Sequence, residues 1–216
     1  MVFLDLKRDK YMCLDQMQTR AIWPFLNSRS SDFEVQESTI VTDTVNLLLD
    51  NEILTLNPNS GKDISSAYIE RPSRELTGYD PDKKPKTLAK HIYYFLSSCL
   101  ISAIYLRLLS LNYIVQMLGK RRRKHQRTKQ AIPKEKFQDL VGIFKSLRPL
   151  IFTSHDNCMF HSLALIEFLS HFNLYPCWVF GVKMGPFVAH CWVQHDDMTL
   201  NDSVDHVAAF TPIMAV

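Results

Sequence analysis

The sequence predicts an α+β protein in two parts, a small unit of one hairpin and two helices followed by a larger unit in which helices precede a sheet. Short runs of β-prone residues lie near both ends of the chain, and segments with helical spacing of apolar residues lie between them. A stretch rich in proline and turn residues divides 1–80 from 81–216, and we expect these ranges to be two domains. A length of 216 residues is enough for one large domain or two small ones.

Composition narrows the setting in which the protein works. The formal net charge is only +3, so nucleic acid is not an expected partner. The five cysteines are an odd number at irregular spacing, which argues against a disulfide framework and for reduced thiols. Met1–Tyr11 contains five charged side chains and therefore lacks the apolar core of a signal peptide. We expect an unexported, cytoplasmic protein.

A hairpin and a helix are expected at the start of the chain. Val2–Leu6 and Tyr11–Leu14 are apolar-rich runs separated by four charged residues, which is the pattern of a small hairpin. Between Met17 and Leu26, apolar residues recur every three to four positions, so they lie on one helical face.

A second helix is expected to extend to Leu54. Thr42 or Asp43 can cap its first turn, because either side chain accepts hydrogen bonds from free backbone amides. Turn residues at 57–61 end the helix, and the segment from there to Lys86 is typical of a linker.

The next stretch permits more than one interpretation. His91–Leu118 is mostly apolar and meets the nominal length of about 20 residues for a membrane span. Arg107 near its middle and several polar residues favour a core helix, and membrane association is the less favoured alternative. Gly119–Lys129 is strongly basic, and it is either a solvated connection or a dock for an acidic protein, RNA or anionic lipid. No aromatic residue interleaves its charges, so we favour the solvated connection.

A nucleophile is suggested where a buried helix begins. Glu135–Leu147 is an ordinary amphipathic helix, whereas the helix from Cys158 to Phe172 is apolar around much of its circumference, as expected deep in a domain. Residues 154–157 can cap it. Cys158 then lies in the first turn, where free amides favour a thiolate. A buried structural cysteine is the alternative.

The strands that follow supply partners for this thiol. Cys177–Val182 and Phe187–His195 are β-prone, and side-chain alternation places His190 and Trp192 on one face of the second strand. A three-residue connection, 196–198, would pair His195 with Thr199 and make His190 and Asp202 diagonal neighbours on that face. The hypothesis is that His190 acts as general base toward Cys158 and that Asp202 orients His190.

A metal site is the weaker alternative. Its ligands would be His155, Cys158, His161, Cys191 and His195, but paired C-x-x-C motifs are missing and His190 and Cys191 point to opposite faces. We therefore expect no metal. His171 and His206 are expected to be surface histidines.

The C-terminal motifs resemble a known family. They are Cys158-Met-Phe-His-Ser-Leu-Ala-Leu, Val179-Phe-Gly-Val, Pro186-Phe-Val-Ala-His190-Cys-Trp-Val, Leu200-Asn-Asp202 and Phe210-Thr-Pro-Ile. This set resembles the B proteins of bacterial lasso-peptide biosynthesis, which are leader peptidases with a transglutaminase-like fold related to papain. The family's catalytic Cys, His and Asp fall on Cys158, His190 and Asp202, at intervals of 32 and 12 residues. The position after His190 is often small in that family, and Cys191 departs from this pattern.

The start of the chain resembles the same family more weakly. Phe3-Leu-Asp-Leu and Asp9-Lys-Tyr-Met-Cys-Leu are similar to the opening of its proteobacterial members, in which a winged-helix-like element binds the precursor's leader. The resemblance implies that a strand of the hairpin, with the groove beside the Asp43–Asn51 helix, binds the leader by strand addition. The residues expected to take part are Phe3, Leu4, Tyr11, Cys13, Leu47 and Leu48.

The resemblance implies a cysteine endopeptidase that removes the leader of a ribosomally made precursor in antibiotic biosynthesis. The expected partners are that leader and an asparagine-synthetase-like cyclase, which would close the ring. No intrinsic cofactor is expected, and any ATP requirement would belong to the cyclase. Two alternatives remain open: a transglutaminase-like acyltransferase that uses the same triad, and a non-catalytic scaffold that presents the precursor.

Overall fold

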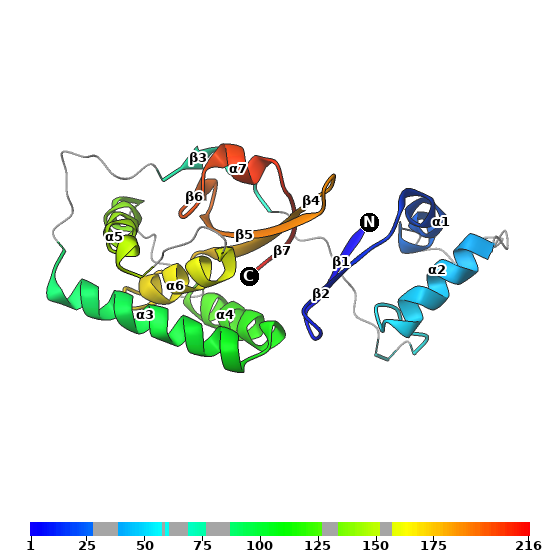
Figure 1. Ribbon diagram of the computed structural model, residues 1–216, viewed down its shortest axis with the longest axis horizontal. Helices are drawn as coiled ribbons and strands as arrows, with labels where there is room; N and C mark the ends of the chain where they lie inside the picture. Colours follow the sequence, from blue (N-terminus) through cyan, green and yellow to red (C-terminus); the bar gives the residue numbers. More distant parts are fainter. Residues whose placement is uncertain (28–38, 58, 61–68, 77–86, 127–133, 152–156) are drawn as a thin grey trace. The chain divides into compact units, whose positions relative to one another are not determined.

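The chain forms two compact units, Met1–Ser66 and Ala67–Val216 (Figure 1). The computed structural model describes all residues except 28–38, 58, 61–68, 77–86, 127–133 and 152–156. The boundary between the units falls earlier than the expected one at residue 80. The reason is that part of the predicted linker pairs with the sheet of the second unit.

The first unit contains a hairpin and two helices. Strand β1 (Val2–Asp5) pairs antiparallel with β2 (Lys10–Cys13). Helix α1 (Gln16–Asn27) follows Asp15, whose carboxylate accepts from the Gln18 amide at 2.7 Å while the Gln18 side chain accepts from the Asp15 amide at 3.0 Å. This reciprocal pair satisfies two amides at the helix start, so α1 begins sharply.

The second helix of this unit begins earlier than predicted. Helix α2 spans Thr39–Asp50, so Thr42 and Asp43 lie inside it with exposed side chains instead of capping it. Its buried side presents Leu48, which joins Leu14 and Ile22 in the core of the unit. Leu48 is completely buried. In this structure Leu48 therefore presents no surface to a leader peptide.

The second unit is built on a five-stranded sheet in the order β3-β6-β5-β4-β7. The strands are β3 (Arg74–Glu75), β4 (Cys177–Lys183), β5 (Val188–His195), β6 (Met198–Thr199) and β7 (Thr211–Ala215). The expected hairpin β4–β5 is present, with Val179 opposite Trp192 and Gly181 opposite His190. The sequence did not reveal β3 and β7, because one is two residues long and the other follows a short helix.

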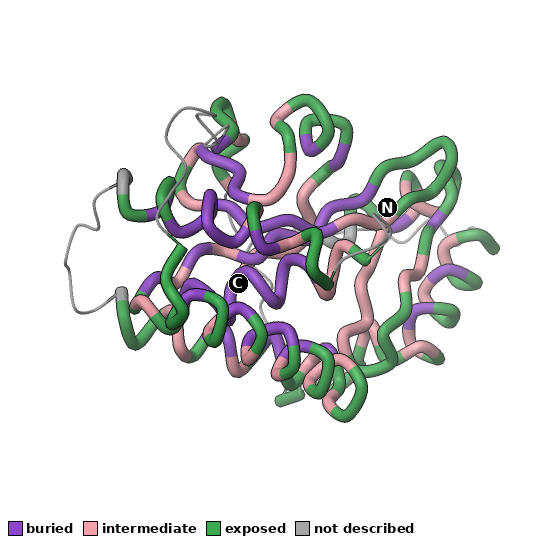
Figure 2. Tube along the Cα trace, turned by 60° about the vertical axis from the view of Figure 1, so that its left-hand side comes forward, coloured by how far each residue is buried: buried purple, intermediate pink, exposed green. Residues whose placement is uncertain are grey.

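Helices cover the sheet. Helix α6 (Cys158–Ser170) packs on β5 and is buried on nearly all sides, as predicted, and α3 (Ala89–Leu108) and α5 (Lys134–Leu147) pack against α6 (Figures 1 and 2). The phenyl rings of Phe95, Phe144 and Phe168, one from each of these helices, lie in contact. A short 3₁₀ turn, η1 (Arg148–Leu150), follows α5. On the other face of the sheet, helix α7 (Val204–Ala208) packs Val207 against Val179 and Trp192.

The predicted linker is partly structural. Arg74 donates two side-chain hydrogen bonds to the Asp197 carboxylate, at 2.5 and 2.8 Å, and Ser73 donates a third at 2.8 Å. The Leu76 amide donates to the Thr199 carbonyl at 2.8 Å, which continues the parallel pairing of β3 with β6. These bonds attach residues 73–76 to the sheet of the second unit.

The ambiguous apolar stretch is two helices. Helix α3 ends because Leu109 adopts an extended conformation, and α4 (Leu111–Gln126) starts after it, with the Ser110 hydroxyl accepting from the Tyr113 amide at 3.3 Å. Among the described helices, α3 alone is long and apolar enough to cross a membrane. Its inner side packs on α6 with Phe95, Ser98 and Ser102 fully buried.

Over its described length the basic run is part of a helix and not a connecting loop. Residues 120–126 are the last turns of α4, and residues 127–129 lie outside the described part of the chain. Arg121 donates to both oxygens of Glu167 on α6, at 2.7 and 3.0 Å, and the Glu167 side chain is only 5% exposed. Burial raises the pKa of Glu167, and the guanidinium opposes that rise. The pair therefore joins α4 to the core helix.

We expect Arg121→Ala to lower the free energy of unfolding, because it leaves the Glu167 carboxylate buried without its cation. Removing one partner of a wholly buried pair costs roughly 3–5 kcal/mol. Solvent reaches Arg121, so we expect a loss of about 2 kcal/mol here. Urea unfolding at neutral pH measures it, with Lys120→Ala on the exposed side of α4 as control. Equal stability of the two variants would contradict a structural role for the pair.

Candidate active site

The nucleophile candidate lies where α6 begins. Cys158 is the first residue of the helix and is partly buried. Asn157 precedes it with φ −110° and ψ 58°, outside the helical region, and makes no side-chain capping bond, and the other predicted caps, 154–156, lie outside the described residues. The first amides of the helix have no acceptor within it, which gives this end a partial positive charge.

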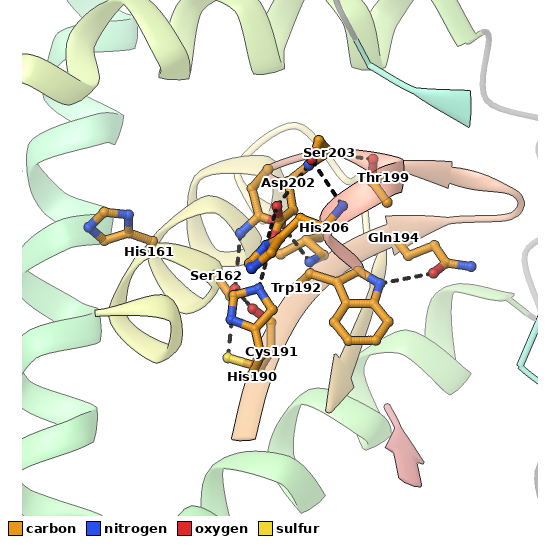
Figure 3. Close-up of polar contacts among 12 residues, drawn as sticks. His161, Ser162, His190, Cys191, Trp192, Gln194, Thr199, Asp202, Ser203 and His206 are labelled. Atoms are coloured by element: carbon orange, nitrogen blue, oxygen red, sulfur yellow. Dashed lines mark hydrogen bonds and ion pairs between the residues drawn. The ribbon is translucent and has the colours of Figure 1, made fainter. Parts of the chain in front are cut away.

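The structure brings His190 and Asp202 together. Their side chains are joined by a hydrogen bond of 2.5 Å between Nε2 and Oδ2 (Figure 3). The predicted register that led to this pair is wrong, because the connection is the two residues Asp196 and Asp197 and His195 faces Met198. Asp196 adopts a positive φ of 51° in this tight turn.

Asp202 reaches His190 from a loop and not from a strand. Strand β6 ends at Thr199, and the Thr199 hydroxyl donates to the Asp202 carbonyl at 2.7 Å, which turns the chain back toward β5. The Ser203 amide then donates to Asp202 Oδ1 at 2.8 Å. The loop therefore fixes the carboxylate by its own hydrogen bonds.

Because β6 is short, one edge of β5 is open beside His190. In the described sheet, only Gln194 and His195 of β5 pair with β6. His190 and Cys191 point to opposite faces, yet both interact with Cys158 at this edge: the His190 ring and the Cys191 thiol and amide all hydrogen-bond the Cys158 sulfur. The His190 Nε2 atom is occupied by Asp202, so Nδ1 is the nitrogen that exchanges a proton with Cys158.

These contacts invert the usual order of the two pKa values. Hydrogen bonds from Cys191, joined by the hydrogen bond and charge of His190, outweigh burial and lower the pKa of Cys158 to about 4. Burial alone would lower the pKa of His190, but Asp202 and the Cys158 thiolate outweigh it and raise that pKa to about 9. At neutral pH the site therefore holds a thiolate and an imidazolium, the state in which a cysteine nucleophile is activated.

Asp202 also hydrogen-bonds a second histidine, His206. His206 Nδ1 lies 2.9 Å from Asp202 Oδ1 and 3.1 Å from Oδ2, and its ring meets the His190 ring edge-on at 4.8 Å (Figure 3). His206 is therefore part of the site, although it is 53% exposed and we expected an ordinary surface histidine. Its spacing of four residues from Asp202 was the signal, because the short helix α7 brings these positions together.

A buried polar network supports Cys191 and the Asp202 loop. Asn201 accepts from the Val193 amide at 2.7 Å and donates to the Ser162 hydroxyl at 3.0 Å. Ser162, one turn after Cys158, donates to the Cys191 carbonyl at 3.3 Å, and the Cys191 sulfur lies 3.9 Å from its hydroxyl. Sequence reasoning missed Ser162 and Asn201, although both stand inside the motifs around Cys158 and Asp202.

Cys158, His190 and Asp202 line a cavity of about 480 Å³. Much of the remaining wall is polar or charged, and it includes Lys145, Arg148, His161 and Glu75. Arg148 donates to His161 Nδ1 at 2.8 Å, because a guanidinium has no acceptor. The cavity is large enough for a few residues of an extended peptide.

The alternative metal ligands do not form a cluster in the described part of the chain. His161 is engaged by Arg148, and His195 stacks on Phe137 at 4.3 Å between ring centroids. Cys158 and Cys191 interact with each other, and His155 lies outside the described residues. The ligand atoms of His190, Asp202 and His206 lie within 4.8 Å of one another, but these side chains are joined to each other by hydrogen bonds.

The predicted leader-binding residues, apart from Leu48, lie on the hairpin and α2 of the first unit. Phe3 and Leu4 are on β1, Tyr11 and Cys13 on β2, and Leu47 is 38% exposed on α2. In the described chain this sheet has only two strands, so each strand has one edge without a partner strand.

Comparison with known proteins places this fold in a family. Residues 100–215 match the family model described as the transglutaminase-like superfamily, and the match includes Cys158, His190 and Asp202. Searches among curated proteins and among solved structures gave no significant match.

We expect Asp202→Asn to lower kcat/KM by about 10³- to 10⁴-fold, as when an orienting carboxylate is lost from a triad. Asp202 raises the pKa of His190, so the imidazolium persists up to about pH 9 in the wild type and loses its proton at lower pH in the variant. The alkaline limb of the pH–rate profile should therefore move to lower pH. Asp205→Asn on α7 is the matched control, and an unmoved limb would contradict the assigned role.

We expect Cys191→Ala to raise the pKa of Cys158, because it removes the hydrogen bond that the Cys191 thiol gives to its sulfur. The acidic limb of Cys158 alkylation by iodoacetamide, followed by peptide mass spectrometry, should move from about pH 4 to higher pH. Cys177→Ala, which removes another partly buried thiol, should leave the limb in place. Identical limbs in the two variants would show that Cys191 does not tune the nucleophile.

Proposed function

This chain belongs to the transglutaminase-like superfamily, and on that premise we propose that it is a cysteine peptidase that removes the leader from a ribosomally made lasso-peptide precursor. The observation that carries the proposal is the Cys158, His190 and Asp202 arrangement, in which a thiolate and an imidazolium coexist at neutral pH. The transglutaminase-like domain is compatible with either a cysteine protease or an acyltransferase. The five C-terminal motifs, which resemble the lasso B proteins, favour the peptidase.

In the proposed reaction, the Cys158 thiolate attacks the carbonyl carbon of the scissile peptide bond. The Cys158 amide, which has no acceptor within α6, is suited to stabilise the developing oxyanion. His190 gives its Nδ1 proton to the leaving amine, which departs as the free N-terminus of the core peptide. The leader remains on Cys158 as a thioester.

Water completes the cycle. His190, now neutral, takes a proton from a water molecule that attacks the thioester, and the leader leaves with a free carboxylate. Cys158 returns to thiolate and His190 to imidazolium. Asp202 keeps the ring oriented through both steps, and its 2.5 Å bond to Nε2 stabilises the imidazolium.

The first unit suits leader recognition. Its two-stranded hairpin leaves strand edges open in the described chain, and an extended leader can add to such an edge by main-chain hydrogen bonds. Affinity at a distance from the cut makes a site selective for its own precursor. Phe3, Leu4, Tyr11, Cys13 and Leu47 are the proposed contacts. A separate asparagine-synthetase-like cyclase would use ATP to join the freed amine to a side-chain carboxylate.

The test is to incubate the purified protein with its lasso precursor in H₂¹⁸O and to follow the products by mass spectrometry. We expect a core peptide with a free amine and a leader acid that carries one heavy oxygen, because water is the acceptor. Cys158→Ala should form neither product, whereas Cys177→Ala should form both. Deleting the part of the leader remote from the cut should lower kcat/KM.

Two results would replace the proposal. A leader recovered as an amide, without heavy oxygen, would show acyl transfer to an amine. Leader removal that persists in a reaction containing Cys158→Ala and the cyclase would show a presenting scaffold.

A further inference from the structure

Helix α3 has an unusual distribution of side chains for a helix packed in a domain. Small and polar residues, Ser98 and Ser102, are completely buried on its inner side. Large apolar residues are exposed on its outer side: Ile92 40%, Tyr93 67%, Leu96 48%, Leu100 63% and Ile104 43%. Exposed and buried residues alternate along the long helices of this unit (Figure 2).

These five residues and the exposed Ala103 form one surface, which we call the α3 apolar face. On an ideal helix they fall within an arc of roughly 120° and extend for about 18 Å. No charged residue occurs between Ile92 and Leu106. An exposed continuous apolar surface of this kind marks an interaction site.

The charged residues of α3 and α4 are all cations, although Asp139 of α5 lines the same cavity as Lys90. Lys90 and Arg107 are exposed at its two ends. Neither α3 nor α4 contains an acidic residue, and α4 adds exposed Lys120, Arg123 and Lys124. The sequence from Lys83 to Lys134 lacks Asp and Glu altogether, although the whole chain has 22 of them. Charge complementarity therefore favours an anionic occupant.

We propose that the α3 apolar face binds the surface of an anionic lipid bilayer, with α3 lying parallel to the membrane plane. An apolar helix face bordered by cations and carrying an exposed tyrosine has the composition of an interfacial helix. Lys90 and Arg107 have stems long enough to keep their charges at the headgroups while the apolar side chains enter the acyl boundary. The lipid phosphates supply the negative charge that the protein lacks here.

A spanning arrangement does not fit this helix. Its inner side packs on α6, and Tyr94 stacks on His171 at 4.5 Å between ring centroids. Crossing the bilayer would remove α3 from α6 and expose Phe95, which is fully buried, and the Phe144 ring of α5 that contacts it.

A second copy of the chain is a poor occupant. Two α3 faces packed antiparallel would bring Lys90 of one copy toward Arg107 of the other, without acidic residues on either helix to offset them. Packed parallel, they would place like residues against each other. In both arrangements the contact is between like charges, which is unfavourable.

Vesicle flotation with the purified full-length protein tests the proposal. Wild type should float with phosphatidylcholine vesicles that contain phosphatidylglycerol and remain unbound with phosphatidylcholine alone. High salt should weaken the binding, because the electrostatic part is screened. Leu100→Glu should lower the partition coefficient at least tenfold. Leu150→Glu places the same charge at a residue that is 68% exposed on η1, and it should bind as wild type does.

Each of the following outcomes either supports or overturns binding of the α3 apolar face to a bilayer. Failure of wild type to float with anionic vesicles would overturn the proposal, as would equal binding by Leu100→Glu. A wild-type dimer in light scattering that Leu100→Glu converts to a monomer would assign the face to a second copy. Ile104→Glu, a second substitution on the same face, should lose binding as Leu100→Glu does. Circular dichroism should show that both variants keep the wild-type fold. The readout is independent of peptide cleavage, so Cys158→Ala should float as well as wild type.

Discussion

The geometry of the candidate active site depends on the open edge of β5. Strand β6 pairs with only the last two residues of β5 and then stops, so the part of β5 that carries His190 and Cys191 has no described neighbour on that side. The start of α6 lies against this edge and brings Cys158 to both residues. A longer β6 would satisfy the edge with main-chain hydrogen bonds and displace the thiol, because every backbone group of a paired strand is engaged.

Burying three ionisable groups at one edge is costly unless each has a partner. Here the partners form a chain, in which Cys191 donates to Cys158, Cys158 faces His190, and Asp202 joins His190 to His206.

The packing beneath this chain is equally specific. Gly181 lies opposite His190 in the β4–β5 pair, and a Cβ there would come within 2.8 Å of the Trp192 ring. Glycine therefore lets Trp192 and Phe210 pack below the imidazole.

Much of the fold was predictable, because the periodic apolar patterns of α1, α5, α6 and the β4–β5 hairpin are long and local. The proximity of Cys158, His190 and Asp202 was also predictable. The backbone geometry that brings His190 and Asp202 together was not predictable. Strand parity predicted a β6 register that is one residue off, and Asp202 meets His190 from a loop. Two ion pairs, Arg121 with Glu167 and Arg74 with Asp197, join segments that are distant in the sequence. Local sequence patterns do not predict such contacts.

The difference between the pKa values of the cysteines also makes their reactivities toward electrophiles different. Burial raises the pKa of Cys99 to about 12 and raises that of Cys177, whereas Cys158 is ionised above about pH 4. At mildly acidic pH, about one Cys99 side chain in a million is a thiolate, while nearly every Cys158 is. A soft electrophile applied under those conditions therefore labels Cys158 in preference to the buried Cys99 and Cys177, and the covalent label marks the folded state, because unfolding removes the contacts that ionise the Cys158 sulfur.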